Sequence, residues 1–460
     1  MKTIIWWIRR DLRLHDNPAL DHALMHGDLV IPLFILDPHL LSHPHSNRDL
    51  FLFNALQSLD KDLLGKGSRL IIRYGKPLEL LREVQQKSNA HLITAEADHS
   101  PYAKKRDDQI GRSLPLVTLT GLTVHPPQVI RKADGSPYTV YTPYAKVWKS
   151  LPLPGKPLGS PTTLPAVPDQ IKTDALPLSR KFDAFPADEH SARKRIDQFL
   201  ESSIFSYKAR RNFLADNATA RISPYLKFGL LSIREIFHHV QSIKNQLENQ
   251  AIRASCETWR NELIWREFYY SILANFPQVT RYSFRENLRG IRWLDDRKGL
   301  QAWQKGLTGY PLVDAAMRQL SESGWMHNRA RMITASFLTK DLLIDWRAGE
   351  RWFMRYLIDG DIASNNGGWQ WTAGTGTDAA PYFRIFNPIL QSKKFDPDGD
   401  YIRQWVPELA HLDNNMIHMP WKFPDLRLDY PPPIIDHKFA RERTLSAYQS
   451  AKSLFENQSR

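Results

Sequence analysis

The chain has 460 residues, 42% hydrophobic and 24% charged, which is enough for two or three domains of an ordinary globular protein. Its 62 Lys and Arg against 49 Asp and Glu give a net charge of +13, which favours a polyanionic partner such as nucleic acid. The single cysteine, Cys256, excludes an intrachain disulfide and a cysteine zinc cluster. The apolar runs are too short for a signal peptide or a membrane span, so we expect a cytoplasmic protein with no membrane partner.

The N-terminal part alternates apolar runs with helical patterns. Strands are predicted at Thr3–Ile8, Leu29–Leu36, Leu70–Tyr74, His91–Ala95 and Leu116–Val124, and helices at Asp49–Leu64 and Pro77–Gln86. This order predicts an α/β domain with a parallel, Rossmann-like sheet, which binds ligands at the carboxyl ends of its strands. Because Arg9-Arg10-Asp11-Leu12-Arg13 replaces Gly-x-Gly-x-x-Gly after the first strand, a dinucleotide site is not expected there.

Two further domain-sized segments follow. Residues 131–190 are rich in proline and are predicted to form a long connector between a domain at 1–130 and a larger all-helical domain at 191–460. Helical patterns occupy Ala192–Leu200, Ile233–Leu247, Ala254–Phe276, Leu312–Glu322, Asn328–Leu343 and Gly349–Ile358. Of the 14 tryptophans, all but Trp6, Trp7 and Trp148 lie at residue 259 or later, which makes the helical part the predicted working half.

One stretch of the helical part is unusually dense in indole, amide and glycine. It runs from Asn365 to Arg384, and Asp359 and Asp361 stand just ahead of it. Indole is easily oxidised, and the Gly367-Gly368 pair permits a bend, so the stretch predicts a redox or stacking site. A well-packed aromatic core is the alternative.

Two predicted helices carry chemistry on one face. Trp259, Glu262, Trp265 and Arg266 lie three and four residues apart, which suits a carboxylate that binds a flat polar ligand between two rings. Core packing with a Glu–Arg pair at the rim explains this helix equally well. A second helix is predicted to place Trp325, Asn328, Arg331 and Met332 on one face, where a buried amide and guanidinium need polar partners.

A helix start is predicted at Ser223, with Ser223 as the cap and Pro224 at the first helical position. The preceding Thr219 and Arg221, together with free backbone N–H groups, suit a phosphate or pyrophosphate. An ordinary capped helix is the commoner outcome for such a motif. The pairs His43/His45 and His238/His239 lack carboxylates at metal spacing, so no metal site is predicted.

Four motifs, at Trp259–Tyr269, Gly309–Arg318, Trp325–Met332 and Asn365–Arg384, resemble the photolyase/cryptochrome family. The resemblance covers essentially the whole chain and is greatest to bacterial class I cyclobutane pyrimidine dimer photolyases. It implies a monomeric flavoprotein without an obligate protein partner, which holds FAD in the helical domain and repairs damaged DNA. In this family, light-excited reduced FAD passes an electron to a flipped pyrimidine dimer, the cyclobutane ring splits, and the electron returns.

The resemblance also assigns cofactor residues. Asp359 and Asp361 would face the isoalloxazine and ribitol of FAD, and the segment from Thr219 to Ser223 would face its phosphates. Asn365 would face the flavin N5, where an amide favours the anionic reduced flavin that repair requires. The complete set of implied FAD contacts is Tyr207, Thr219, Ala220, Arg221, Ile222, Ser223, Trp259, Arg266, Asn328, Arg331, Asp359, Gly360, Asp361 and Asn365.

Electron transfer and DNA binding are implied at further positions. Trp369, Trp346 and Trp293 match the family's electron-transfer chain of three tryptophans. The lesion pocket would be formed by Glu262, Trp265, Met332 and Trp371, with Glu262 hydrogen-bonding the carbonyl edge of a pyrimidine and the two indoles stacking on the flipped dimer. The DNA backbone would be contacted by Arg211, Arg329, Arg384 and Gln391.

Some points stay open in this interpretation. Ser100 stands where folate-binding members tend to carry an acid, and Asp98 resembles a position used by deazaflavin-binding members. For a second, antenna chromophore, these residues favour a deazaflavin slightly over methenyltetrahydrofolate. A cryptochrome-like blue-light photoreceptor and a six-four photoproduct repair enzyme are alternatives; the latter class places histidine in the lesion pocket, where this chain has Met332. A flavin oxidoreductase independent of light is the weakest alternative.

Overall fold

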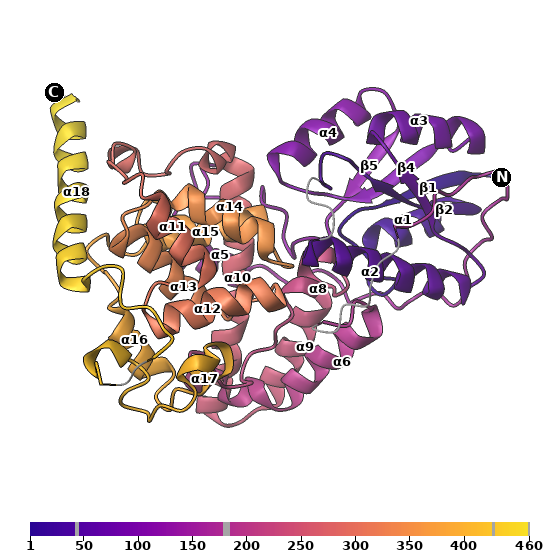
Figure 1. Ribbon diagram of the computed structural model, residues 1–460. Coiled ribbons are helices and arrows are strands. Elements are labelled where there is room, and N and C mark those ends of the chain that lie inside the picture. Colours follow the sequence, from indigo (N-terminus) through magenta and orange to yellow (C-terminus); the bar gives the residue numbers. More distant parts are fainter. Residues whose placement is uncertain (42–45, 178–184, 426–427, 459–460) are drawn as a thin grey trace. The chain divides into compact units, whose positions relative to one another are not determined.

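The computed structural model describes residues 1–41, 46–177, 185–425 and 428–458 (Figure 1). The chain forms two compact units. The first comprises Met1–Lys208 and Thr219–Pro277, and the second comprises Ala209–Ala218 and Gln278–Arg460. The predicted domain boundaries after residues 130 and 190 stay predictions.

A parallel sheet of five strands forms the centre of the α/β part of unit 1, which confirms the predicted fold class. The strands are β1 (Thr3–Ile8), β2 (Leu29–Leu36), β3 (Ile71–Tyr74), β4 (Leu92–Glu96) and β5 (Leu116–Leu119), in the spatial order β3-β2-β1-β4-β5. Every residue of β1 and β2 is buried, because helices cover both faces of the sheet (Figure 1). The strand order reverses between β1 and β4, so the carboxyl ends of these two strands mark the switch point of the fold.

Four helices cover this sheet: α1 (Pro18–His26), α2 (Asn47–Leu64), α3 (Pro77–Ser88) and α4 (Pro101–Gly111). We predicted α2 and α3 but neither α1 nor α4. Both missed helices begin with a capping residue followed by proline. Asn17 Oδ1 accepts hydrogen bonds from the backbone N–H of Ala19 and Leu20, and Ser100 Oγ accepts one from Ala103.

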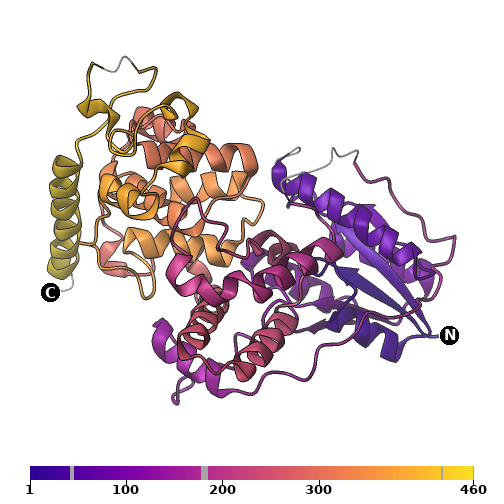
Figure 2. The ribbon, with the colours of Figure 1, turned by 90° about the horizontal axis from the view of Figure 1, so that it is seen from below.

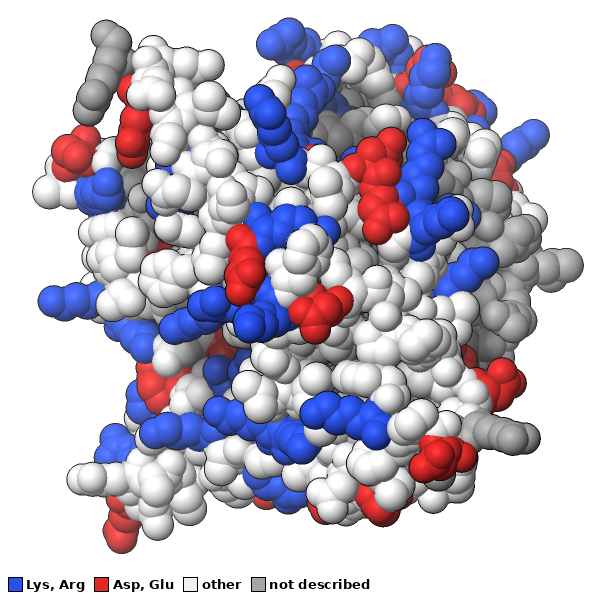
Figure 3. All heavy atoms as spheres, turned by 60° about the vertical axis from the view of Figure 1, so that its left-hand side comes forward, with Lys and Arg blue, Asp and Glu red and all other residues white. Residues whose placement is uncertain are grey.

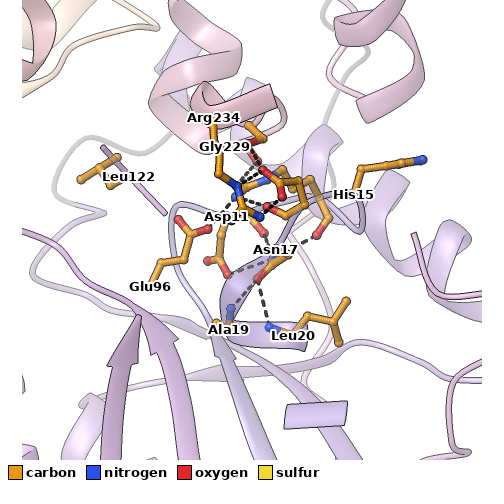
Figure 4. Close-up of polar contacts among 12 residues, drawn as sticks. Asp11, His15, Asn17, Ala19, Leu20, Glu96, Leu122, Gly229 and Arg234 are labelled. Carbon is orange, nitrogen blue, oxygen red and sulfur yellow. Dashed lines mark hydrogen bonds and ion pairs between the residues drawn. The ribbon is translucent and has the colours of Figure 1, made fainter. Parts of the chain in front are cut away.

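The loop after β1 contains a buried ion-pair network (Figure 4). The Arg13 guanidinium donates to Glu96 Oε1 at 2.6 Å, to the Asp16 carbonyl at 2.8 Å and to the Gly229 carbonyl at 3.1 Å. Burial raises the pKa of Glu96 to about 7, against the opposing pull of Arg13. Gly229 is required here, since a Cβ on it would lie 1.8 Å from the Arg10 carbonyl oxygen. The protein's own ion pairs therefore occupy the carboxyl end of β1.

The rest of unit 1 is helical. It contains α5 (Tyr141–Ser150), α6 (Glu189–Glu201), a 3-10 turn η1 (Ser203–Ser206), α8 (Ser223–Phe228), α9 (Ile233–Gln246) and α10 (Gln250–Asn275); the short α7 (Tyr207–Arg210) begins where the two units meet in the chain. Helix α5 lies within the segment predicted as a connector. It is ordered by packing on α10, where Trp148 Nε1 donates to Glu267 Oε2 at 2.7 Å.

Unit 2 is built almost entirely from helices (Figure 2). They are η2 (Pro277–Thr280) at its boundary, η3 (Glu286–Leu288), α11 (Arg297–Lys305), α12 (Pro311–Ser323), α13 (Asn328–Ser336), the π-helix η4 (Phe337–Asp341), α14 (Trp346–Tyr356), α15 (Ile362–Ala373), α16 (Pro388–Phe395), α17 (Asp400–Trp405), η5 (Pro407–Leu409), η6 (Pro420–Lys422) and α18 (His437–Gln458). Its main core contains Trp303, Trp346, Trp369 and Phe353. The predicted bend at Gly367-Gly368 is wrong, because both glycines lie inside α15.

Candidate functional site

A buried carboxylate precedes α15 in unit 2. Asp359 is 7% exposed, and its Oδ2 accepts a 2.7 Å hydrogen bond from Arg331 Nη2 of α13. Its other oxygen, Oδ1, is buried and has no hydrogen-bond partner. A buried acceptor without a partner costs about 1–3 kcal/mol. The position therefore suits a ligand that offers an N–H or O–H donor.

The start of α15 is fixed by hydrogen bonds to α14. Asp361 caps α15, its Oδ1 accepting from the Ser364 N–H at 3.0 Å. Asn365 Nδ2 donates to the backbone carbonyl of Glu350 at 3.0 Å, and Asn366 Nδ2 donates to Glu350 Oε1 at 2.9 Å. Burial raises the pKa of Glu350 to about 7. The side chain of Asn365, the predicted partner of the flavin N5, is thus held by α14 at Glu350, the residue whose carboxyl has the raised pKa.

The three predicted electron-transfer tryptophans all lie in unit 2. Trp369 is 2% exposed and meets the edge of Phe353 with ring centroids 4.9 Å apart. Trp346, the first residue of α14, is fully buried. Trp293 is partly exposed and meets Tyr448 of α18 at 90°, with 6.0 Å between centroids. Burial therefore decreases from Trp369 and Trp346 to Trp293, as a route from the interior to the surface requires.

Met332 and Trp371, predicted for the lesion pocket, are partly exposed on α13 and α15. On α13, Asn328 Nδ2 lies 3.9 Å from Met332 Sδ, so these two side chains share one face as predicted. Trp325 does not share it, because α13 begins at Asn328 with His327 as its cap. That part of the predicted helical face is wrong.

The predicted DNA-backbone contacts of unit 2 differ in how firmly they are held. Arg329 donates to Asn212 Oδ1 at 2.8 Å and lies 4.4 Å above the Phe395 ring, so its guanidinium is preorganised. Arg384 is exposed, Arg211 is partly exposed, and Gln391 on α16 has a buried Oε1 without a partner. Figure 3 shows many Lys and Arg side chains at the surface, with Asp and Glu side chains among them. The net charge of +13 suits a polyanionic ligand.

In unit 1, α10 carries two of the residues that were predicted for the lesion pocket. Glu262 and Trp265 are partly exposed on this helix. The indole of Trp265 stacks on Tyr141 of α5 with 3.7 Å between centroids and 7° between planes. Tyr141 is itself fixed, because its hydroxyl donates to the Asn261 carbonyl at 3.0 Å. Sequence reasoning missed Tyr141, since it lies in the proline-rich segment where no helix was predicted.

Two other predicted residues of α10 are held by the protein. Trp259 is 4% exposed and packs on Phe199 of α6, with 5.0 Å between centroids. The Arg266 guanidinium donates to the Leu122 carbonyl at 2.8 Å and lies 4.8 Å from the centroid of the Tyr270 ring. Of the four predicted residues of this helix, Trp259 is therefore part of the core and Arg266 is held by a backbone carbonyl. Glu262 and Trp265 are the two that are partly exposed.

The predicted phosphate segment of unit 1 has an unusual backbone. Arg221 has φ 50°, in the left-handed region, and Thr219 Oγ1 is buried without a partner. Helix α8 begins at Ser223, but its cap is Ile222, so the prediction of Ser223 as the cap is wrong. Tyr207, also predicted to bind the cofactor, is 8% exposed.

The predicted site residues fall in both units. Unit 1 contains Tyr207, Thr219, Ala220, Arg221, Ile222, Ser223, Trp259, Glu262, Trp265 and Arg266; unit 2 contains Arg211, Trp293, Asn328, Arg329, Arg331, Met332, Trp346, Asp359, Gly360, Asp361, Asn365, Trp369, Trp371, Arg384 and Gln391. Within unit 1 the structure aligns Glu262 and Trp265 on α10, and within unit 2 it pairs Arg331 with Asp359.

The two residues considered for an antenna both have structural partners. Asp98 accepts from the Ser100 N–H at 2.9 Å and lies 3.6 Å from the Arg10 guanidinium. Burial raises the pKa of Asp98, but Arg10 and this hydrogen bond outweigh it and hold the pKa below its ordinary value. Ser100 caps α4. Neither arrangement selects between the two antenna chromophores.

The described part of the chain contains no group of three or more His, Cys, Asp or Glu side chains that could hold a metal ion. His43 and His45 lie outside the described residues. None of the described helices is both long and apolar enough to cross a membrane.

Comparisons with known proteins match both the N-terminal α/β part and the helical part of the chain. Residues 4–167 match the family described as DNA photolyase, and residues 259–450 match the FAD binding domain of DNA photolyase. Proteins named deoxyribodipyrimidine photo-lyase from Escherichia coli and Synechococcus are 40% and 39% identical, each over 98% of this chain and 99% and 97% of their own. The chain therefore belongs to the DNA photolyase family, and its helical part is an FAD-binding domain.

Solved structures show the same fold over nearly the full length. A bacterial class III photolyase from Agrobacterium tumefaciens is 36% identical with a TM-score of 0.91, covering 98% of both chains. A cryptochrome from Synechocystis is 29% identical with a TM-score of 0.89, covering 97% of this chain and 99% of its own.

Proposed function

We propose that this protein repairs cyclobutane pyrimidine dimers in DNA with light, as a deoxyribodipyrimidine photo-lyase of class I. The observation that carries the proposal is the partly exposed pair of Glu262 and Trp265 on α10, with Trp265 backed by Tyr141. A carboxylate beside a held indole can recognise a flat base by its polar edge and by its face. Full-length similarity to proteins named as photo-lyases supports the same reaction.

FAD fits the residues present. Asp359 Oδ1 is a buried acceptor without a partner, and FAD offers N–H and O–H donors in its isoalloxazine, ribityl and ribose groups. Asp359, Asp361, Arg331 and Asn365 would hold it in unit 2, and the segment from Thr219 to Ser223 would hold its phosphates in unit 1. When bound and reduced, FAD supplies the light-absorbing electron donor of the reaction.

The pocket residues would bind the flipped dimer. Trp265 and Trp371 would stack on its bases, each for about 1–3 kcal/mol. Base flipping, used by photolyases generally, costs a few kcal/mol and least for a damaged pair, so the lesion is favoured over intact DNA. Glu262 would accept hydrogen bonds along the pyrimidine edge and orient the dimer, and Met332 would pack beside it.

The tryptophans would keep the cofactor reduced. An electron taken from Trp369 would be replaced from Trp346 and then from Trp293, which carries the oxidised centre toward the surface. The decrease in burial along this series supports that direction. Arg211, Arg329, Arg384 and Gln391 would hold the DNA backbone without reading its sequence.

Finer assignments also belong to this proposal. We expect a cytoplasmic monomer without an obligate protein partner, and an antenna, where one is bound, that is a deazaflavin. The similarity to a class III structure makes class III the second candidate subclass. The absorption spectrum of purified protein, compared with that of its extracted FAD, reveals any second chromophore.

A cryptochrome-like photoreceptor is the second candidate function, because the Synechocystis cryptochrome shares the fold over nearly the whole chain. The choice of substrate under light distinguishes dimer repair from six-four repair and from photoreception without repair. Reduced protein would be illuminated with duplexes that carry one cyclobutane dimer, one six-four photoproduct or no lesion, and the products separated chromatographically. We expect restored pyrimidines from the cyclobutane duplex alone. Conversion of the six-four duplex alone, or of neither damaged duplex, would contradict the proposal.

A further inference from the structure

One of the two faces of the Trp265 indole is covered within unit 1. The Tyr141 ring of α5 lies parallel to it, with 3.7 Å between centroids and 7° between planes. Aromatic pairs in proteins usually keep about 4.5–7 Å between centroids, so the overlap of these two rings is nearly complete. A base cannot enter between two rings that are already in contact. A flipped base can therefore stack only on the opposite face of Trp265.

Tyr141 is itself held in place by α10. Its hydroxyl donates to the backbone carbonyl of Asn261 at 3.0 Å, one turn before Trp265. Its ring also meets the edge of Phe268 at 6.0 Å between centroids and 78° between planes. Burial raises the pKa of the Tyr141 phenol, and the charge of Glu262 raises it further, so the phenol keeps the proton that this hydrogen bond needs. Asn261 and Phe268 thus fix the ring that covers Trp265.

The indole of Trp265 has further aromatic neighbours on its own helix. Phe268 meets it at 5.6 Å between centroids and 84° between planes, and Tyr269 meets it at 5.7 Å and 38°. An aromatic side chain that moves freely must be ordered when a ligand stacks on it, and this ordering costs affinity. Trp265 is partly exposed, yet Tyr141 and these two rings already hold it in one orientation. Stacking on it therefore requires little further ordering.

We propose that Tyr141 is a positioning residue for lesion recognition, which holds the Trp265 indole ready to stack on a flipped dimer and closes its other face to bases. The inference rests on the proposed function, in which Trp265 stacks on the dimer. It gives the segment before α6 a part in substrate specificity, because Tyr141 is the first residue of α5. Tyr141 acts only through Trp265, so its loss should matter for flipped bases and not for the intact duplex.

A double-mutant cycle with Trp265→Leu tests the inference, because it separates an effect exerted through Trp265 from a general structural one. Full-length protein with bound FAD is titrated in the dark with duplexes that carry one cyclobutane dimer or no lesion. Tyr141→Leu should weaken binding of the damaged duplex about three- to tenfold and leave binding of the undamaged duplex unchanged. In the Trp265→Leu background the same change should have no further effect. Tyr141→Phe keeps the stacked ring and should retain most of the affinity.

The matched control is Tyr138→Leu, which removes another partly exposed tyrosine three residues earlier in the chain. It should leave binding of both duplexes unchanged. Flavin content equal to wild type shows that each variant is folded. Where Tyr141→Leu loses flavin, Tyr141→Met takes its place in the cycle, because methionine fills the space without presenting a rigid plane.

Unchanged affinity of the folded Tyr141 variant for the damaged duplex would overturn the assignment. So would an equal loss for both duplexes, or a loss that persists in full when residue 265 is leucine. A wild type that binds the damaged duplex no better than the undamaged one would instead contradict the proposed function on which the inference rests.

Discussion

The indole of Trp369 lies in the space that the missing side chain of Gly349 leaves open. A Cβ built on Gly349 would lie 2.1 Å from Trp369 Cη2 and 2.6 Å from Leu338 Cδ2. Both neighbours belong to the core of unit 2, so neither is free to move aside. Because Gly349 lies one turn after Trp346 on α14, the same helix places Trp346 and receives Trp369.

Gly349→Ala should therefore displace Trp369. Alanine would favour the helix by about 0.5–1 kcal/mol, but overpacking of this core costs about 1–3 kcal/mol. We expect a lower free energy of unfolding and slower photoreduction of oxidised flavin. The control is Gly111→Ala in α4, where an added Cβ meets nothing within 4 Å. Equal effects of the two changes on unfolding would contradict the packing argument.

Removal of the Glu262 carboxylate should impair repair but not cofactor binding. In Glu262→Ala the dimer loses the hydrogen bonds along its pyrimidine edge, worth about 1.5–3 kcal/mol for a charged acceptor. We expect a several-fold lower quantum yield of repair with normal FAD content, and partial recovery in Glu262→Gln. The readout is dimers repaired per absorbed photon in pre-reduced protein. An unchanged yield in the alanine variant would refute the assigned role.

Stability should depend on pH through Glu350. Its pKa is raised by burial from 4.5 to about 7, so between these values the folded protein binds a proton more tightly than the unfolded chain. The contribution to stability is complete below pH 4.5 and is lost as pH rises to about 7. For this partly exposed group we expect a loss of about 1–2 kcal/mol.

Glu350→Gln should flatten this dependence when unfolding by urea is compared at pH 5 and pH 8. The Asn366 amide keeps an acceptor in the glutamine variant, so the packing is retained. Glu286→Gln, an exposed carboxylate paired with Arg289, is the control. A Glu350→Gln variant with the wild-type pH dependence would show that the carboxyl titrates alike in the folded and unfolded states.

Binding to DNA should respond to Arg384 independently of sequence. An exposed arginine that neutralises one phosphate contributes about 0.9 to the slope of log K against log salt. Arg384→Ala should lower affinity for damaged and undamaged duplexes alike and reduce the slope by about that amount. Titrations at several salt concentrations measure it, with the exposed Lys76→Ala as control. A loss confined to damaged DNA would place Arg384 at the lesion instead of the backbone.

The ends of β1 and β2 could be predicted to the residue because each is a nearly continuous apolar run; β3 differs from the prediction by one residue at one end, and β4 by one residue at each end. The predicted end of β5 at Val124 is wrong, because this strand stops at Leu119, ahead of the polar Thr120 and Gly121. Helices α1 and α4 were not predicted, although each begins with a local signal in the sequence. This signal is a capping residue followed by proline, Asn17-Pro18 and Ser100-Pro101. The helical state of Gly367 and Gly368 had no such signal. Asp361 caps α15 locally, but the helical state of the two glycines also depends on the burial of Trp369 and Gln370, which is a tertiary effect.

For the site, residue types and spacing indicated which side chains carry chemistry but not what holds them. The stacking of Tyr141 on Trp265 joins two helices that are distant in sequence, so no local pattern predicts it. The Asn365 side chain donates to the backbone carbonyl of Glu350. Every residue has such a carbonyl, so the sequence does not predict this contact. The left-handed backbone of Arg221 is equally hidden, since arginine has no preference for that conformation.

The most direct measurement is the thymine absorbance of an oligonucleotide that carries one cyclobutane dimer, mixed with reduced protein and kept in blue light or in the dark. Dimerised bases have lost the double bond that gives thymine its ultraviolet absorbance, so repair restores it. The account predicts recovery of absorbance in light and none in the dark. Equal absorbance in both conditions, with FAD bound and reduced, would contradict light-driven dimer repair by this protein.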